Sequence, residues 1–406
     1  MNQVSVTEKT DLNKYTIPHI LDALMETSYK NNMSYACWRL PSDHTIYFTV
    51  DFSGGAKIEK ISLEQSVPGY IVHPFEADQE RQGYFIKSDL LFNAASKEIT
   101  LSMASEQAGE KFIKEFHLHL EKDVEQYDHY YTSDFASSDH PSEAYKEMVT
   151  EASEAIAEER FKKVVLARRR EINVDKNINI AEIFTKVCEQ YPVSFISFIS
   201  SAYTGSWLTA SPETLVSIDK NNIFRTVALA GTQRLNEGDK ISQTVWTQKE
   251  IEEQALVARY IINCFKSIRI REYDDIGPRT IKAGELAHLR TDFSVNIKEV
   301  NFPELGSVML DLLHPTSAVC GMPKAETLDF IKKHEGFKRE FFSGYLGPVN
   351  IHHESHIFVN LRCAKLSKGK ALLYAGAGII ADSDPEKELA ETELKMETIG
   401  RFLSSK

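Results

Sequence analysis

Short β-rich runs and amphipathic helical stripes alternate along the whole chain, and this mixture is the feature that most constrains the fold. Runs such as TIYFTVDF at residues 45–52 and VSFISFIS at residues 193–200 have the length and the side chains typical of strands. Residues 249–265 and residues 385–406 instead carry apolar side chains three and four apart, which indicates helices that pack on another element. No repeat or sustained heptad accompanies them. The sequence therefore predicts a mixed α and β protein and excludes solenoids, propellers and coiled coils.

A polar segment, YTSDFASSDHPSEAYKEM at residues 131–148, predicts a boundary near residue 140. Before it we expect mainly strands, including residues 45–52 and 83–86, and few helices. After it we expect a helix from Pro141 to about Arg160, a helix near residues 181–190, and strands near Trp207 and at residues 214–218.

The charge balance excludes several classes of partner. The chain has 47 basic and 59 acidic residues, a net charge of −12, whereas nucleic acids and anionic membranes bind basic surfaces. We therefore expect neither as a partner, and an anionic substrate would need cations gathered locally. The five cysteines are scattered and form no C-x-x-C pair, which argues against a zinc site or a disulfide framework. Because no signal-peptide core or membrane-length apolar stretch is present, we expect a cytoplasmic protein.

The segment LLYAGAGIIA at residues 372–381 imitates a dinucleotide-binding fingerprint, because Gly376, Gly378 and Ala381 have the G-x-G-x-x-A spacing. Its context argues against nucleotide binding, since Asp384 and Pro385 cap a helix that runs to the chain end and no second strand follows. Two alternatives stay open here: a tight turn, or a site at which backbone N–H groups bind an anion.

Two predicted helices place carboxylates on one face. Glu250 and Glu253 are three residues apart on the first helix, and Glu388, Glu391 and Lys395 share a face of the last one. Like charges at this spacing repel, so each face is either exposed to water or binds a cation. The two faces together would supply the oxygen ligands that Mg²⁺ prefers, although spacing alone does not join them.

Ten short motifs follow one another in a specific order after residue 161, and over about three fifths of the chain they resemble the chorismate-utilising enzyme family. Within that family the isochorismate synthases are the most similar. The motifs are KVVLAR at 163–168, SPETL at 211–215, LAGT at 229–232, KEIEEQ at 249–254, HLRTDF at 288–293, LLHPTSAVCGMPK at 312–324, EGFKREFFSGYLG at 335–347, NLRCAK at 360–365, AGAGI at 375–379 and ELAETELKM at 388–396.

The resemblance implies an α+β fold in one large domain, with large, mainly antiparallel sheets stacked on each other and surrounded by helices. Residues 1–140 would form the variable N-terminal part of this fold, and residues 141–406 the chorismate-binding catalytic region.

The resemblance also implies a site. Chorismate would be the substrate and Mg²⁺ the cofactor, with Glu253 and Glu391 as direct ligands and Glu250 and Glu388 behind them. The residues implied to bind the substrate are Gly231, Thr232, His288, Arg362, Gly376 and Lys395. Alternative interpretations remain open for several of these: an ion pair for Arg362 or Lys395, and a structural role for His288. Arg339 keeps the place that the family motif expects, and an internal ion pair with Glu335 is equally consistent with the sequence.

The implied reaction is the addition of water at C2 of chorismate with loss of the C4 hydroxyl, which gives isochorismate for menaquinone or a catechol siderophore. Lys163 would be the general base, so we expect it in a closed, partly apolar pocket, while Lys162 would be exposed. Glu213 would be the general acid, which requires a raised pKa.

Other reactions in this family set the alternatives. Ala230 stands where aminodeoxychorismate synthases have a nucleophilic lysine, so we expect neither amination nor a glutamine amidotransferase subunit. Salicylate synthase, which also eliminates pyruvate, is the first alternative, although small Ala318 resembles the non-lyase members. An inactive chorismate-binding scaffold protein is a more distant alternative.

Overall fold

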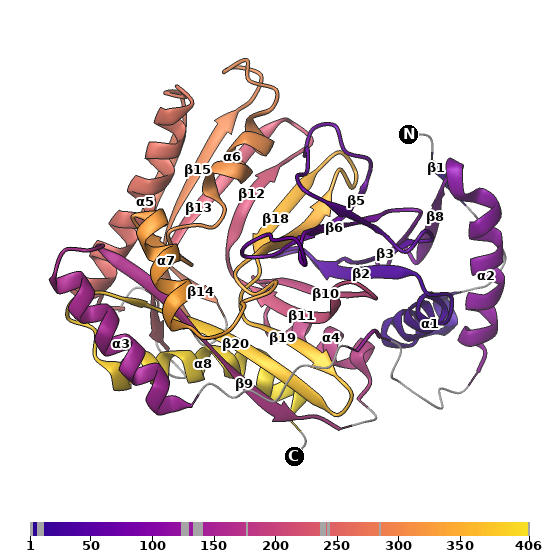
Figure 1. The fold of residues 1–406 in the computed structure, drawn as a ribbon. Coiled ribbons are helices and arrows are strands. Elements are labelled where there is room, and N and C mark those ends of the chain that lie inside the picture. Colours follow the sequence, from indigo (N-terminus) through magenta and orange to yellow (C-terminus); the bar gives the residue numbers. More distant parts are fainter. Residues whose placement is uncertain are drawn as a thin grey trace.

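The computed structural model describes residues 3–5, 12–122, 130–132, 141–175, 178–235, 241, 244–283 and 286–404. Two sheets stack on each other in this part of the chain, and helices cover their outer faces (Figure 1). Every strand pairing within the two sheets is antiparallel. The expected α+β fold with large antiparallel sheets is confirmed.

The first sheet has 11 strands. In spatial order they are β1 (Gln3–Ser5), β8 (Glu98–Ser102), β7 (Leu90–Asn93), β3 (Ile46–Asp51), β2 (Ser34–Arg39), β10 (Phe195–Ser201), β11 (Gly205–Ser211), β19 (Cys363–Ser367), β20 (Lys370–Ile379), β9 (Lys163–Asn173) and β16 (Gly321–Met322).

The second sheet has nine strands. In spatial order they are β14 (Asp274–Ala283), β15 (Leu286–Asn296), β13 (Ile223–Arg234), β12 (Thr214–Ile218), β18 (Ser355–Val359), β17 (Tyr345–Val349), β5 (Gly69–His73), β6 (Gly83–Lys87) and β4 (Ala56–Ile58). The α-helices are α1 (Ile17–Lys30), α2 (Glu106–Leu120), α3 (Ser142–Ala157), α4 (Ile180–Gln190), α5 (Gln248–Ser267), α6 (Leu305–Leu313), α7 (Lys324–His334) and α8 (Pro385–Leu403).

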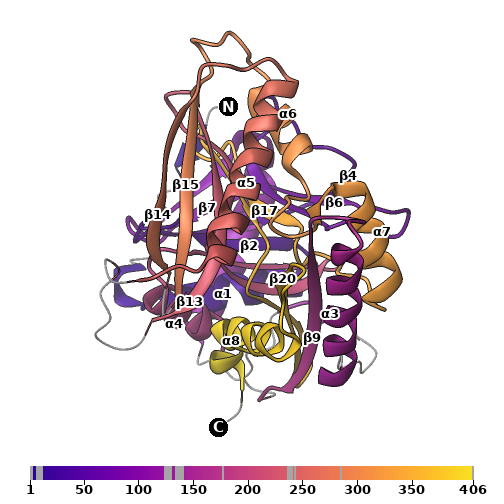
Figure 2. The same ribbon diagram turned by 90° about the vertical axis from the view of Figure 1, so that its left-hand side faces the viewer.

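The core has three apolar layers. The central layer lies between the sheets, where Phe195 of β10 stacks on Phe358 of β18 with ring centroids 3.9 Å apart. One outer layer joins the first sheet to α1, α2, α4 and α8, and the other packs α3, α5, α6 and α7 largely against the second sheet and β9. Figure 2 shows α5 lying along β13 and β15, with α8 beneath β20.

Most elements expected from the sequence are present. The strands expected at residues 45–52, 83–86 and 214–218 are β3, β6 and β12, and the helices expected after residues 141, 181, 249 and 385 are α3, α4, α5 and α8. Asp384 caps α8 as predicted, with its carboxylate accepting the Glu386 N–H at 2.9 Å. The helices α1 and α2 were not identified individually, although the buried stripe of Ile20, Leu21 and Leu24 in α1 has helical spacing.

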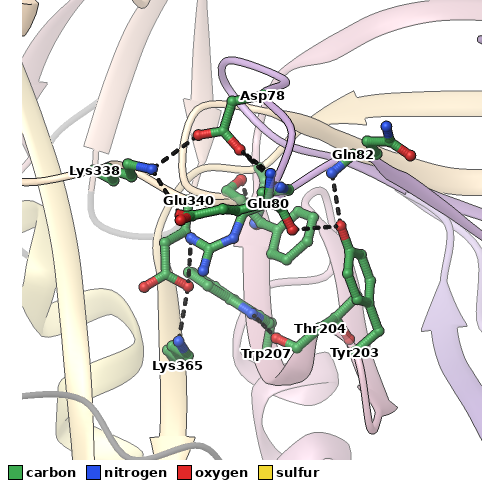
Figure 3. Close-up of polar contacts among 12 residues, drawn as sticks. Asp78, Glu80, Gln82, Tyr203, Thr204, Trp207, Lys338, Glu340 and Lys365 are labelled. Carbon is green, nitrogen blue, oxygen red and sulfur yellow. Dashed lines mark hydrogen bonds and ion pairs between the residues drawn. The ribbon is translucent and has the colours of Figure 1, made fainter. Parts of the chain in front are cut away.

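Residues before position 140 take part in both sheets. Strand β2 lies between β3 and β10 in the first sheet, and β5 lies between β6 and β17 in the second. Side chains add further links (Figure 3): Lys338 Nζ donates to Asp78 at 2.9 Å and to Glu80 at 3.0 Å, and the Gln82 N–H donates to the Tyr203 hydroxyl at 2.7 Å. The two parts of the chain therefore share one pair of sheets.

Helix hydropathy excludes a membrane-spanning helix within the described ranges, because none of the helices there is long and apolar enough to cross a bilayer.

Candidate active site

A cavity of about 100 Å³ lies where the two sheets bring their helices together, and it gathers most of the residues implied by the motifs. The first sheet contributes β9, β20 and the helix α8 that packs beneath them, and the second contributes β13, β15 and α5. The lining residues are Lys163, Val165, Pro212, Glu213, Leu229, Ala230, Gly231, Lys249, Glu250, Glu253, His288, Ala318, Leu361, Arg362, Gly376, Gly378, Glu391 and Lys395.

Two of the expected residues are not part of this lining. Glu388 lies behind it as the partner of Lys249. The side chain of Thr232 falls outside the described residues.

Strand β9 presents Lys163 to the cavity and Lys162, just before the strand, to solvent. Lys163 is only 4% exposed, whereas Lys162 is exposed, as expected from the sequence. The Lys163 ammonium lies 3.4 Å from a carboxylate oxygen of Glu253 on α5. Gly378 on the adjacent strand β20 leaves the space for this contact, because a Cβ atom there would lie 2.8 Å from Cε of Lys163. The pairing of β9 with β20 therefore determines both the position of Lys163 and the space available to its side chain.

Glu213 is a buried carboxyl group in the turn between β11 and β12. Burial raises its pKa to about 8, although the nearby cations Arg362 and Lys163 act in the opposite direction. The carboxyl group is therefore mostly protonated at neutral pH. This is the protonation state that a general acid requires.

Arg362 brings to the cavity wall a cation that has no hydrogen-bonded partner among the described residues. Its residue is 9% exposed, and the guanidinium has no hydrogen bond or ion pair with any side chain or backbone group in the described ranges. Burial lowers its pKa to about 10, against the influence of Glu391 and Glu213, so the group stays charged at neutral pH. Its backbone is left-handed, with φ 47°, at the start of β19. The alternative of a core ion pair for Arg362 is therefore not what the structure shows, and a buried planar fork of donors is suited to a carboxylate.

The backbone of Gly376 also faces the cavity. Gly376 pairs with Ala167 of β9, and the Ala167 N–H points away from β20 because it donates to Glu335 at 2.8 Å. In an antiparallel ladder such a pair exchanges no hydrogen bonds, so the N–H and C=O groups of Gly376 also point away from β9. Its carbonyl accepts from Lys395 Nζ at 2.7 Å. Gly376 and Gly378 lie inside β20, so the tight-turn interpretation of this motif is wrong.

His288 on β15 is held in a neutral form. Its Nδ1 lies 2.9 Å from the Gly231 carbonyl oxygen, which can only accept, so Nδ1 carries the proton. Burial, and to a lesser extent the positive charge of Arg362, lower the pKa of His288 to about 3. Gly231 has φ 69° and sits where the register of β13 shifts between Ala230 and Gln233, and this bulge turns its carbonyl to the histidine.

The four acids of the two helices take different roles. Burial favours a raised pKa for Glu391, but Lys395, 2.6 Å away, and further cations outweigh it and lower the pKa. Glu388 is 2% exposed and accepts from Lys249 and, at 2.8 Å, from Ser383. Glu250 closes a capping box at the start of α5 by accepting the Thr247 N–H at 2.8 Å.

A divalent cation suits part of this set. Glu253 and Glu391 face one cavity with carboxylate oxygens, the ligands that Mg²⁺ prefers. In the described part of the chain, however, no three His, Cys, Asp or Glu side chains are already arranged around a metal position. The carboxylates of Glu253 and Glu391 are paired with lysines instead, so a cation would replace Lys163 and Lys395 as their partner.

Two residues of this region, Lys249 and Gly378, had not been assigned to the site from the sequence. Lys249 lines the cavity, and its position four residues before Glu253 on the same helix was an available signal. Gly378 makes room for Lys163, which only the strand pairing reveals. Arg339, for which two interpretations were open, forms a buried ion pair with Glu335 and does not line the cavity.

Comparison with known proteins places the chain among its relatives. The family model described as "Chorismate binding enzyme" matches residues 64–404. The isochorismate synthase EntC of Escherichia coli K12 is 30% identical over 260 residues, which are 63% of this chain and 66% of that protein. The isochorismate synthase MenF of the same strain is 30% identical over 256 residues, 62% of this chain and 58% of that protein. The matched region thus spans less than two thirds of these relatives.

Solved structures share the fold. MenF, the menaquinone-specific isochorismate synthase from Escherichia coli, superposes with a TM-score of 0.75 over 99% of this chain and 94% of that chain, at 22% identity. Anthranilate synthase component I from Streptococcus pneumoniae superposes with a TM-score of 0.65 over 90% and 89% of the two chains, at 18% identity.

Proposed function

This chain belongs to the chorismate-binding enzyme family, and from that premise we propose that it converts chorismate to isochorismate in the presence of Mg²⁺. Relatives named isochorismate synthases, about 30% identical over three fifths of the chain, support the choice of reaction. The observation that carries the proposal is the Arg362 guanidinium, which has no hydrogen-bonded partner among the described residues, in a cavity that also holds a protonated Glu213 and a buried Lys163.

The cavity offers a dianion two places for its carboxylates. Arg362 can clamp one carboxylate with two parallel hydrogen bonds, and Gly376 and its neighbour Lys395 line the same cavity. Glu253 and Glu391 would hold Mg²⁺, which, when bound, neutralises the charge of the other substrate carboxylate. Neutral His288 offers a hydrogen-bonding imidazole without adding charge.

Charge counting supports the pairing of a dianion with a divalent cation. Four cations surround the cavity: Lys163, Lys249, Arg362 and Lys395. With Glu213 protonated, four carboxylates balance them: Glu250, Glu253, Glu388 and Glu391. A dianion alone or Mg²⁺ alone would leave a net charge in a buried space, whereas the two together restore neutrality.

The chain's own residues then divide the proton transfers. Lys163, the ammonium of the resting cavity, would first release a proton, and its amine would then take a proton from a water molecule as the oxygen attacks C2 of the ring. Glu213 donates its proton to the C4 hydroxyl, which leaves as water while both ring double bonds shift. One water is consumed and one is released, so the reaction is an isomerisation. Lys163 would thus act as the base and Glu213 as the acid.

Small side chains favour this reaction over its relatives. Ala230 and Ala318 both line the cavity, so the position of the nucleophilic lysine in aminodeoxychorismate synthases is occupied by a methyl group. We expect no amidotransferase subunit for the same reason.

The five cysteines are all free and buried, which agrees with a reducing compartment such as the cytoplasm. The product would serve menaquinone or catechol siderophore biosynthesis.

Incubation of the purified protein with chorismate and Mg²⁺, followed by chromatography, tests the proposal. Isochorismate should accumulate without stoichiometric pyruvate, and ammonia should not be incorporated. One pyruvate per product would move the assignment to salicylate synthase. Anthranilate or another aminated product would contradict the role of Lys163, and no turnover with intact chorismate binding would indicate a scaffold protein.

A further inference from the structure

We infer that the ion pair between Lys249 and Glu388 is a positioning tie that sets the distance between the two helices carrying the Mg²⁺ acids. This inference rests on the proposed function, because it concerns the same cavity. It assigns to Glu388 an action through Lys249 and not on the metal. Lys249 lies on α5 and Glu388 on α8, and their side chains form a hydrogen-bonded ion pair.

The position of the pair along both helices carries the argument. Lys249 lies four residues before Glu253 on α5, and Glu388 lies three residues before Glu391 on α8. Residues three and four apart occupy the same face of a helix. The tie therefore sits about one turn from each acid that faces the cavity, and it holds the two faces toward each other.

The tie crosses between the two halves of the fold. Helix α5 packs against β13 and β15 of the second sheet, whereas α8 packs against β20 of the first. Glu253 and Glu391 thus belong to different halves, and a metal that uses both depends on the distance between them. A link beside the acids fixes that distance better than packing at the far faces of the helices.

Burial makes Glu388 an anchor. It is 2% exposed, does not line the cavity, and also accepts from Ser383 at 2.8 Å. Lys249 is half-buried and lines the cavity. A carboxylate that is turned away from the cavity and held by two donors is placed to fix a lysine, and breaking one partner of such a buried pair disturbs the other.

The direction in which one substitution changes the Mg²⁺ affinity distinguishes positioning from simple electrostatics. Removing the Lys249 charge takes a cation away from the acids, which on Coulomb grounds alone would strengthen Mg²⁺ binding. A positioning tie predicts the opposite. Titration of MgCl₂ into the metal-free full-length protein by calorimetry should give a dissociation constant about tenfold or more higher for Lys249→Met. Lys266→Met, which removes an exposed lysine from the last turn of the same helix, should leave it within about twofold.

A double-mutant cycle completes the test. Glu388→Gln should weaken Mg²⁺ binding about as much as Lys249→Met, and the double variant should be no weaker than either single one, because both remove one tie. Additive losses, or a loss for Glu388→Gln alone, would show that Glu388 acts on the metal and would overturn the inference. Unchanged or tighter binding by Lys249→Met would also overturn it.

The same proteins are assayed with chorismate, so the two hypotheses fail separately. A wild-type protein that binds Mg²⁺ but forms no isochorismate contradicts the proposed function. The double-mutant cycle on Mg²⁺ affinity still tests the Lys249–Glu388 tie in that case. A wild-type protein that forms isochorismate, with Mg²⁺ affinity unaffected in both single variants, contradicts the tie alone. A wild-type protein that binds no Mg²⁺ contradicts both the tie and the metal part of the proposed function.

Discussion

Lys163 and Lys162 are adjacent in the sequence but differ in burial, and this gives a direct comparison at the residue scale. Lys163→Ala removes the base candidate from the cavity, so we expect kcat to fall by about 10² to 10⁴. Lys162→Ala changes only an exposed side chain and should keep kcat within about twofold. Steady-state kinetics with chorismate measures both. Equal losses would mean that the segment matters structurally and that Lys163 is not the base.

Glu213 links both activity and stability to pH, and both should fall as pH rises. Activity that depends on its proton should decline as pH rises through the folded pKa of about 8. The unfolded chain loses the same proton near pH 4.5, so between these two values rising pH favours unfolding, by about 1.4 kcal/mol for each pH unit. Glu213→Gln cannot ionise. We expect it to be nearly inactive yet progressively more stable than the wild type from pH 5 to pH 8.

Denaturant unfolding at several pH values, together with kcat/KM profiles, checks this prediction. A stability difference between Glu213→Gln and the wild type that stayed constant from pH 5 to pH 8 would show that Glu213 is ionised in the folded protein. It would then be a poor proton donor. Rescue of the Glu213→Gln rate by excess Mg²⁺ would instead identify this residue as a metal ligand.

Gly378 controls the space around the base. Its added Cβ would lie 3.1 Å from the Lys163 nitrogen and 3.4 Å from an oxygen of Glu253, so Gly378→Ala should push the flexible lysine tip aside. We expect kcat to fall by roughly 10- to 100-fold, while the melting temperature changes little. The same substitution in a Lys163→Ala background should have almost no effect on the residual rate. A large loss there would assign Gly378 a role independent of the lysine.

The sequence motifs were sufficient to predict which side chains line one cavity, but not the partner of each side chain. Glu213, Arg362 and Lys395 meet in one cavity as the resemblance implied. Which partner each acid has was not accessible, because Glu250 and Glu253 share a helix face but one caps the helix and the other faces Lys163. Such differences depend on contacts between segments far apart in the chain.

At the scale of elements, strand β9 is held on one edge by side chains. The short strand β16 pairs Met322 with Lys163 and Gly321 with Val164, and beyond the Gly321 end the Glu335–Arg339 pair continues the edge. Arg339 donates to the Val165 carbonyl at 2.7 Å, and Glu335 accepts the Ala167 N–H at 2.8 Å. This buried pair therefore replaces a strand beside the segment that carries Lys163.

Breaking this pair should destabilise the whole protein. Arg339→Met leaves Glu335 buried without its cation, which costs about 3–5 kcal/mol. Lys338→Met is the matched control. Lys338 precedes Arg339 in the chain, and its ion pairs with Asp78 and Glu80 lie at the surface, where each is worth about 0–1 kcal/mol. Urea unfolding monitored by circular dichroism compares the two. Similar stabilities for both variants would show that β9 does not depend on the pair.

Elements themselves were more predictable than their pairing. Strand β12 and helix α4 lie within about one residue of the expected ranges, because local periodicity and Asn179 as the N-cap determine them. Helix α1 was not identified, although its apolar stripe was visible. Strand order was beyond reach, since β2 pairs with β10 across more than a hundred residues of intervening chain, and no local pattern records that.

For the whole molecule, the cavity is a product of both sheets. Lys163 and Gly376 come from the first sheet, whereas Gly231 and His288 come from the second. The stacking of the sheets through the central apolar layer therefore determines the shape of the site. Anything that separates the sheets should remove the cavity before it changes any single catalytic group.

This dependence yields a prediction for the N-terminal part. Removing residues 1–140 takes β2 away from β10 and β5 away from β17, and it deletes Trp38 and Tyr70 from the layer between the sheets. The fragment 141–406 would expose two strand edges and apolar surface, so we expect it to aggregate or to unfold without cooperativity, and to bind no chorismate. Co-expression with residues 1–140 as a separate chain should recover soluble, active material, because the missing strands can then pair. Size-exclusion chromatography, thermal unfolding and the chorismate assay measure these outcomes. A monomeric fragment 141–406 that melts cooperatively and turns over chorismate would show that the catalytic region is an independent unit and that the shared sheets are dispensable for the site.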